Sequence, residues 1–201
     1  MPLLDHFRPP LSLRRHWHSF HNSWATYLAA DLNRQLPPEY FAEANVQFGI
    51  ACERVEVCVR NESSRKLVGV VSFVIPAIAD YASRRDAFVT ECVNRIAERV
   101  GLVLVDVVTV PHPNLHAGIL ASLGTPSTAT DNLSATAYRG VERDGDPVVE
   151  MWVEQLRVGE PLPTMPLWLP GGHRLAVVLE DTYNRTWVEQ RVHNGRHGGG
   201  S

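Results

Sequence analysis

Two long apolar stretches separated by one helix-length segment restrict this chain more than any other feature. Residues Leu67–Ile75 and Leu102–Val110 are apolar at almost every position, so neither alternates as a half-exposed strand would. Between them, apolar residues recur every three or four positions from Phe88 to Val100, as in a helix with one buried face. A strand, a helix and a second strand favour a parallel pair with a right-handed crossover.

The flanking segments add antiparallel strands to this pair, which predicts an α/β fold with a mixed sheet. Asp144–Gly145 is a good hairpin turn pair, flanked by the segments 134–142 and 148–157. Further elements are expected as an N-terminal helix with the stripe Trp17, Phe20, Trp24, Leu28 and Leu32, strands over 44–50, 55–60 and 175–179, and a last helix from Asp181. Residues 1–192 are expected to form one domain, and residues 193–201 a disordered tail.

Three local features make narrower predictions about caps and loops. Ser83 is expected to cap the helix of the strand–helix–strand unit, and Gly101 to end it. The four prolines between Pro161 and Pro170 predict a loop.

Composition and charge set limits on partners and location. The net charge is −3, so charge alone does not indicate nucleic acid as a partner. No apolar run is long enough for a membrane span, and the N-terminus lacks the apolar stretch of a signal peptide, so we expect a cytoplasmic protein without a membrane partner. The cysteines Cys52, Cys58 and Cys92 have no framework spacing and are expected to be reduced thiols.

Few side chains qualify as reactive groups. Asp106 lies in an apolar strand, where a carboxylate needs a partner or a shifted pKa, and Arg84 or Arg85 could be that partner. Glu56 is expected on the solvated face of its strand. The sequence contains no Gly-rich phosphate loop and no nucleophile elbow. His18 and His21 lie two and five residues after His16, offsets that do not align on one helix face as three or four would, so metal binding by the three is not expected.

Several motifs resemble one bacterial family. They are MPLLDHFRPPLSLRRHWHSFH, LPPEYFAE, the block from Leu67 to Thr109, GEPLPTMPLWL and LEDTY, and they cover nearly the whole chain in order. The chain is similar to domain of unknown function four-zero-five-eight, a family that resembles the restriction-endonuclease-like P-D…(D/E)-x-K nucleases. The resemblance implies a restriction-endonuclease-like core, in which acidic side chains hold a divalent cation and a lysine stabilises charge during phosphodiester cleavage.

The chain departs from that family at the reactive positions. The central strand and turn of the family read A-I-E-L-V-S-P-x-N-K-D, and here the acid is replaced by Ser72 and the lysine by Ala79, while Asp80 matches. On the following helix, Glu91 stands for a lysine and Arg95 for a tyrosine. The segment after Ala51 is shortened, and Lys66, the one lysine in the chain, has no carboxylate two residues away, as an E-x-K pair requires.

Three functions are consistent with these observations. The first is a catalytically inactive nuclease-like protein with a binding or structural role and no cofactor. The second is a Mg²⁺-dependent nuclease with a rearranged site in which Glu56, Asp80 and Asp106 act and Asp80 and Asp106 hold the metal. The third is a partner-binding module with an exposed apolar patch around Met165–Pro170. Convergence of any two of Glu56, Asp80, Glu91 and Asp106 within roughly 5 Å would favour the second function, and a Ser72 that faces only apolar side chains would count against it.

Overall fold

A computed structural model of the chain describes residues 2–9, 11–14, 16–47, 54–76, 78, 81–126 and 132–192. These residues form five α-helices and eight strands, which confirms the α/β prediction. In chain order the elements are α1 (Leu11–Arg14), α2 (Trp17–Asn33), β1 (Tyr40–Gln47), β2 (Arg54–Asn61), β3 (Leu67–Phe73), α4 (Ala82–Ala97), β4 (Gly101–Asp106), α5 (Leu115–Ser122), β5 (Ser134–Arg143), β6 (Asp146–Gln155), β7 (Thr164–Trp168), a 3₁₀ turn (Pro170–Gly172), β8 (Arg174–Val178) and α6 (Leu179–Glu189).

Six of the strands form one mixed sheet in the order β1-β2-β3-β4-β5-β6. Only β3 and β4 among them run parallel, with Ser72 opposite Leu104, and α4 connects these two strands. All other neighbours in this sheet are antiparallel. The predicted parallel pair and the predicted hairpin around Asp144–Gly145 are both confirmed.

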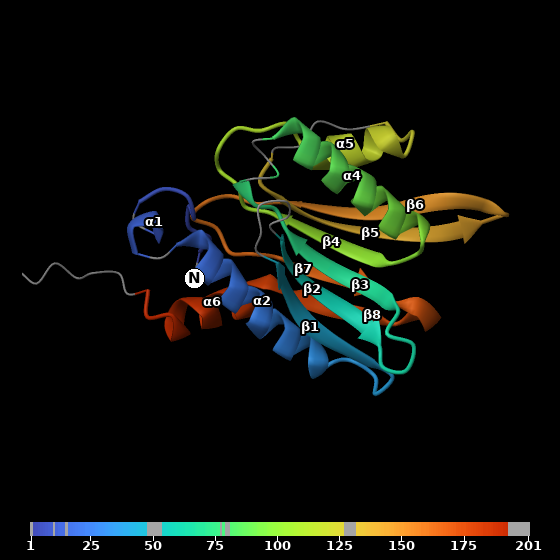
Figure 1. Cartoon of the computed structure of the whole chain (residues 1–201), viewed down its shortest axis with the longest axis horizontal. Helices are drawn as coiled ribbons and strands as arrows, with labels where there is room; N and C mark the ends of the chain where they lie inside the picture. Colours follow the sequence, from blue (N-terminus) through green and yellow to red (C-terminus); the bar gives the residue numbers. More distant parts are fainter. Residues whose placement is uncertain are drawn as a thin grey trace, which may run out of the picture.

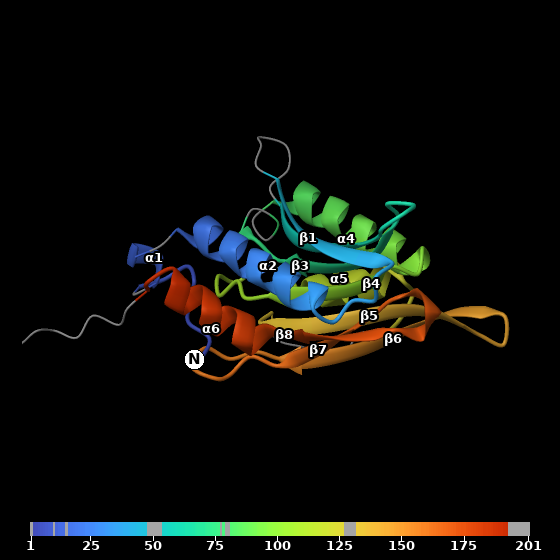
Figure 2. The same cartoon turned by 90° about the horizontal axis from the view of Figure 1, so that it is seen from below.

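The sheet is covered on both faces, as its apolar central strands require (Figure 1). Helices α4 and α5 pack on one face, and α2, α6 and the small β7–β8 sheet cover the other. Figure 2 shows this layering edge-on, with the β5–β6 hairpin extending beyond the rest of the sheet. The aromatic stripe of α2 supplies much of the second layer, because Phe20, Trp24, Leu28 and Leu32 are all buried.

The predicted caps of α4 are wrong. Its N-cap is Tyr81, which makes no side-chain capping bond, so Ser83 already lies inside the helix. The helix ends at Ala97, and Arg99 rather than Gly101 takes the left-handed conformation, with φ of 61°.

The stretch between Pro161 and Pro170 is not a simple loop. Residues Thr164–Trp168 form β7, which pairs with β8 alone and therefore tolerates Pro166. Met165, Leu167, Trp168 and Leu169 are buried, so the apolar patch expected at Met165–Pro170 is not exposed. This burial could not be predicted from the sequence. The small β7–β8 sheet buries its apolar side chains by stacking on the large sheet, and such stacking does not alter the pattern of apolar and polar residues along the segment.

Gly101 is required by a close backbone approach, not by a helix end. A Cβ atom at Gly101 would lie 2.0 Å from the carbonyl oxygen of Trp168, because the chain leaving β7 crosses the start of β4. We expect Gly101→Ala to destabilise the protein by about 3 kcal/mol, since backbone would have to move. Gly118→Ala is the control, because its Cβ would meet only a methyl group of Val89, at 3.3 Å. Urea unfolding measures both, and equal losses would contradict the expectation.

Three further predictions concern a membrane span, the C-terminal tail and the domain boundary. No helix among the described residues is long and apolar enough to cross a membrane. The proposed tail at 193–201 lies outside the described residues. The single-domain boundary at residue 192 stays a prediction.

Candidate functional site

Glu56 and Ser72 lie side by side on the face of the sheet that α4 covers. They are partners across β2 and β3, and the Ser72 hydroxyl donates to Glu56 Oε1 at 3.1 Å. The neighbouring positions of these strands, such as Phe73, face the opposite side, where Phe73 contacts Trp24 of α2. Both residues are about 1% exposed, so this carboxylate is taken out of water.

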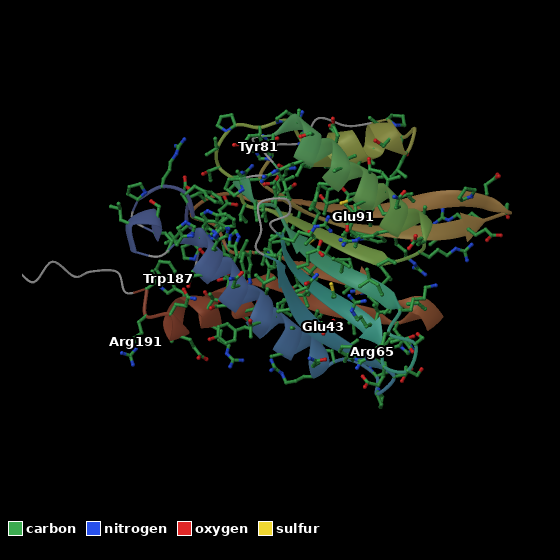
Figure 3. The ribbon with its side chains drawn as sticks, viewed as in Figure 1. Glu43, Arg65, Tyr81, Glu91, Trp187 and Arg191 are labelled. Carbon is green, nitrogen blue, oxygen red and sulfur yellow. The ribbon has the colours of Figure 1, made fainter. Side chains whose placement is uncertain are left out.

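Arg95 of α4 supplies the counter-charge for that carboxylate. Its guanidinium donates to Glu56 Oε1 at 2.8 Å and to Glu56 Oε2 at 3.2 Å, a two-pronged contact that matches the carboxylate geometry. The same group donates to Glu91 Oε1 at 2.6 Å, one turn earlier on α4. Arg54, at the start of β2, also donates to Glu91 Oε1. Figure 3 labels Glu91 on α4, beside the strands.

This group of four charged residues, the Arg95 network (Arg54, Glu56, Glu91 and Arg95), is partly closed to solvent. The side chains of Arg95 and Glu56 are 11% and 2% exposed, while those of Arg54 and Glu91 are each 28% exposed. Burial alone would lower the pKa of Arg95, but its hydrogen bonds to Glu56 and its attraction to both carboxylates outweigh this, so that pKa is raised. The guanidinium is therefore a permanent cation at this point.

Two thiols next to the network are unreactive. Burial raises the pKa of Cys58 to about 11 and that of Cys92 to about 12, so neither forms a thiolate near neutral pH. Both cysteines are free, in agreement with the expected reduced state, and Cys52 lies outside the described residues.

The structure brings some of the candidate residues together and separates others. Ser72, Glu56 and Glu91 meet around Arg95, so the expectation of a solvated Glu56 is wrong. The alternation Val55-Glu56-Val57 looked half-exposed because the sequence could not show that α4 covers the even-numbered face of β2. Ala79 and Asp80 lie outside the described residues.

Asp106 lies apart from this network in its contacts, at the end of β4. Its Oδ2 is 2.9 Å from His112 Nε2, and its Oδ1 accepts from the amide of Val108 at 3.1 Å. The expected partner, Arg84 or Arg85, is therefore wrong, and a histidine six residues later was missed. That loop contains a proline after β4 and returns the ring to the strand end, which spacing alone did not reveal.

The hydrogen bonds of Asp106 and His112 require two protons on the imidazole and the carboxyl group together. A neutral imidazole beside an ionised carboxylate would carry only one. His112 Nδ1 is 2.9 Å from the carbonyl oxygen of Val110, which can only accept. His112 thus donates from Nδ1, and a second proton lies between Nε2 and Asp106. Burial raises the pKa of Asp106, and the hydrogen bond from His112 opposes that rise. The pair is neutral as a whole, which suits a site whose two side chains are 1% and 4% exposed.

A third polar group was missed at the sequence level, the buried histidines at the N-terminus. His6 Nδ1 and His21 Nε2 are 2.8 Å apart, and His6 stacks on Tyr183 of α6 with ring centroids 5.6 Å apart. His6 Nε2 is also 3.2 Å from the Tyr183 hydroxyl. Of the histidines at 16, 18 and 21, His16 is exposed and His21 is buried, and the rings of His16 and His18 lie 4.8 Å apart.

Within the described part of the chain, no group of three or more His, Cys, Asp or Glu side chains is arranged to hold a metal ion. Both oxygens of Glu56 already accept from Arg95, and Asp106 is bound to His112. A cation at Glu56 would have to displace a guanidinium of the same charge sign.

Comparison with known proteins does not assign the chain to a family. No family model, curated protein or solved structure matches it. The resemblance to the nuclease-like family and the restriction-endonuclease-like core therefore stay predictions.

Proposed function

We propose that this chain is a catalytically inactive, nuclease-like protein that acts through binding or as a structural component. The observation that carries the proposal is the contact of Arg95 with both Glu56 and Glu91. In the resembling family, the corresponding strand and helix carry an acid, a lysine and a tyrosine. Here the same surface carries Ser72, Glu91 and Arg95, which are joined to one another through hydrogen bonds that include Glu56.

The guanidinium takes the place that a catalytic cation would need. A metal ion in a nuclease binds carboxylate oxygens and keeps open positions for water and phosphate. Arg95 also binds carboxylate oxygens, but it has no such positions and cannot polarise a water molecule as a metal does. The charge balance of the site is kept while its chemistry is lost.

The lysine content supports the same proposal. Lys66 is the one lysine of the chain, and it lies just before β3, six residues from Ser72 along an extended strand. At about 3.3 Å per residue, the backbone from Lys66 to Ser72 is roughly 20 Å long. A lysine for stabilising charge at the network is therefore lacking.

The rival proposal of a Mg²⁺-dependent nuclease needs Glu56, Asp80 and Asp106 to act together. The contacts of Glu56 run to Arg95 and Ser72, and those of Asp106 run to His112 and Val108. We also propose a cytoplasmic location, which the free thiols Cys58 and Cys92 support.

A cleavage assay tests the proposal directly. Purified protein is incubated with Mg²⁺ or Mn²⁺ and with single- and double-stranded DNA and RNA, beside Glu56→Gln and Asp106→Asn variants. We expect no metal-dependent cleavage by the wild type and no difference between the three proteins. Cleavage by the wild type that either variant abolishes would establish the nuclease instead.

Metal binding gives an independent measurement. A ligand that binds only the folded state raises the melting temperature as its concentration exceeds the dissociation constant. We expect the melting temperature to be the same in Mn²⁺ and in chelator, within error. A rise that Glu56→Gln removes would contradict the proposal.

A further inference from the structure

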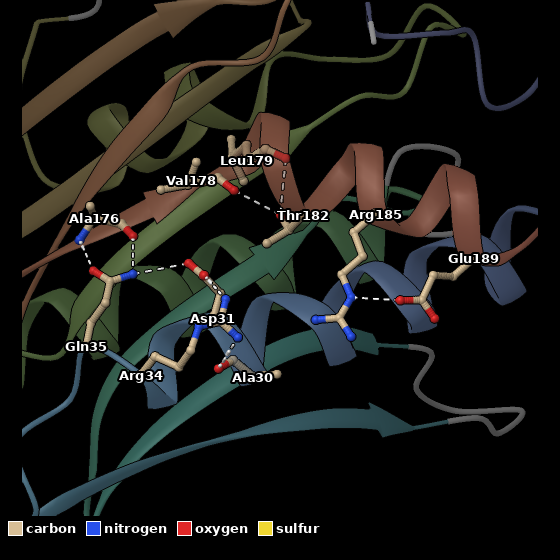
Figure 4. Close-up of polar contacts among 10 residues, drawn as sticks. All are labelled: Ala30, Asp31, Arg34, Gln35, Ala176, Val178, Leu179, Thr182, Arg185 and Glu189. Atoms are coloured by element: carbon tan, nitrogen blue, oxygen red, sulfur yellow. Dashed lines mark hydrogen bonds and ion pairs between the residues drawn. The ribbon is translucent and has the colours of Figure 1, made fainter.

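Two sheet edges in this fold are each blocked at one residue by a side-chain amide from the C-terminal end of α2 or just beyond it. The Asn33 amide donates to the carbonyl oxygen of Ala42 at 2.8 Å and accepts from the Ala42 N–H at 2.7 Å, at the free edge of β1. Gln35 does the same for Ala176 of β8, at 2.9 and 3.0 Å (Figure 4). Each amide imitates one residue of a neighbouring strand, so neither edge offers its backbone at that point.

The opposite edge of the large sheet, β6, has no such closure among the described residues. Asp144 and Gly145 form a two-residue turn with φ values of 54° and 89°, so the flanking residues Arg143 and Asp146 exchange both hydrogen bonds. Bonded and non-bonded pairs then alternate along the hairpin, and the N–H and C=O groups of Val149, Met151 and Val153 point away from β5. No other backbone hydrogen bond within the described part of the chain uses these groups.

Pro147 supports this assignment of the edge. In the same alternation its nitrogen also points outward, so the missing N–H costs no bond to β5. Beyond Pro147, three consecutive outward positions retain both donor and acceptor. They carry the apolar side chains Val149, Met151 and Val153, each only partly buried.

We propose that a second copy of this chain pairs with this edge, forming an antiparallel β6–β6 contact with its two-fold axis at Met151. Met151 then faces the same residue of the other copy, and Val149 faces Val153 across the contact. Each of these directly opposed pairs exchanges two N–H···O bonds. The contact is isologous, so it uses both edges and closes as a dimer.

Charge selects this register over its neighbours. With the axis at Met151, Glu150 lies opposite Trp152 and Glu154 opposite Val148, so no two acids face each other. In the register that places Met151 opposite Val149 of the other copy, Glu150 lies opposite Glu150. In the register that places Met151 opposite Val153, Glu150 lies opposite Glu154. Like charges directly opposite destabilise a strand pair, which disfavours both shifted registers.

The side chains beside the axis suit such a contact. Glu150 forms ion pairs within its own copy with Arg143 at 2.5 Å and with Arg139 at 3.8 Å, which weaken but do not remove its charge. Trp152 is 46% exposed and rests on Trp168 with ring centroids 4.5 Å apart. A tryptophan that is fixed on one side and open on the other gains apolar contact when a second strand is added.

The oligomeric state of the full chain tests the proposal. Light scattering coupled to size exclusion, from about 1 to about 100 μM, is expected to give twice the 22.4 kDa monomer mass in the upper part of that range. Met151→Pro removes an outward N–H and the methionine side chain but no hydrogen bond to β5, and should weaken the dimer at least about tenfold. Met151→Leu keeps the N–H and the apolar side chain, and should dimerise within about threefold of the wild type.

A second variant guards against misfolding of the proline variant. Val149→Lys/Val153→Lys leaves all backbone groups in place but puts four charges at the contact, and should give monomer over the same range. Far-ultraviolet circular dichroism checks that each variant is folded. A wild type that stays monomeric at every concentration, or folded edge variants that dimerise as the wild type does, would overturn the proposal.

Discussion

Arg95→Met is expected to destabilise the protein by about 3–5 kcal/mol, the largest effect of any single charge removal in the described chain. Glu56 would keep its carboxylate at 1% exposure but lose the counter-charge that contacts both of its oxygens. The Ser72 hydroxyl would be left as a single donor, which is not enough for a buried charge. Urea unfolding of wild type and variant at neutral pH measures the loss.

Arg99→Met is a matched control, four residues further along the chain. Arg99 pairs with Glu142 at 2.6 Å, as closely as Arg95 pairs with Glu91, but both side chains are more than half exposed. We expect a loss of at most about 1 kcal/mol, because water and salt screen an exposed pair. If Arg95→Met and Arg99→Met lowered the free energy of unfolding equally, Arg95 would contribute no more than an exposed ion pair does.

The double variant Glu56→Gln/Arg95→Met separates the charge from the packing. A glutamine side chain at this position would keep an acceptor for Ser72 without a buried charge, so the double variant should be more stable than Arg95→Met alone. If the two single losses simply add, the charges do not interact and Arg95 acts through packing only.

Acid is expected to destabilise this protein through the histidine pair at its N-terminus. Burial lowers the pKa of His6 to about 3, with a smaller opposing effect from Asp5. Burial, aided by the neighbouring histidines His6 and His18, lowers the pKa of His21 well below its usual value. An unfolded histidine takes up a proton near pH 6.5, which these rings cannot do in the fold.

Because the pKa values of His6 and His21 are lowered in the folded state, the protein should lose stability as the pH falls. The stabilisation is complete above about pH 6.5 and is lost as the pH falls toward 3, by about 1.4 kcal/mol per pH unit for each ring. Protonating both rings would also break the His6–His21 hydrogen bond, because one shared proton is all it can hold. The free energy of unfolding, measured from pH 7 to pH 4, should therefore fall steeply.

A phenylalanine at position 6 tests the assignment. His6→Phe keeps an aromatic ring against Tyr183 but cannot take up a proton. The dependence of the free energy of unfolding on pH should therefore decrease by about 1.4 kcal/mol per pH unit, the contribution of one proton. His16→Gln, at an exposed histidine at the start of α2, is the control and should leave the slope as it is in the wild type. An unchanged slope in His6→Phe would place the acid sensitivity elsewhere.

Part of the candidate site was accessible from the sequence. The strand–helix–strand unit followed from apolar patterning, and the alignment of Ser72, Glu91 and Arg95 with reactive family positions followed from motif spacing. The partners of these residues did not follow. The ion pairs Arg95–Glu56 and Asp106–His112 join positions that are 39 and 6 residues apart, and they depend on how α4 crosses the sheet and how the loop after β4 turns back.

The sequence by itself determined the class of fold, the one parallel strand pair, the β5–β6 hairpin and the absence of a lysine near the network. These features are written in local periodicity, turn residues and composition, each of which acts over a few residues. Only the tertiary structure decided that Glu56 is buried, that β7 and β8 cover the second face, and that side-chain amides bond the outer edges of β1 and β8 at Ala42 and Ala176. Burial and edge exposure depend on which layer covers a strand, and that is fixed by contacts between segments far apart in the chain.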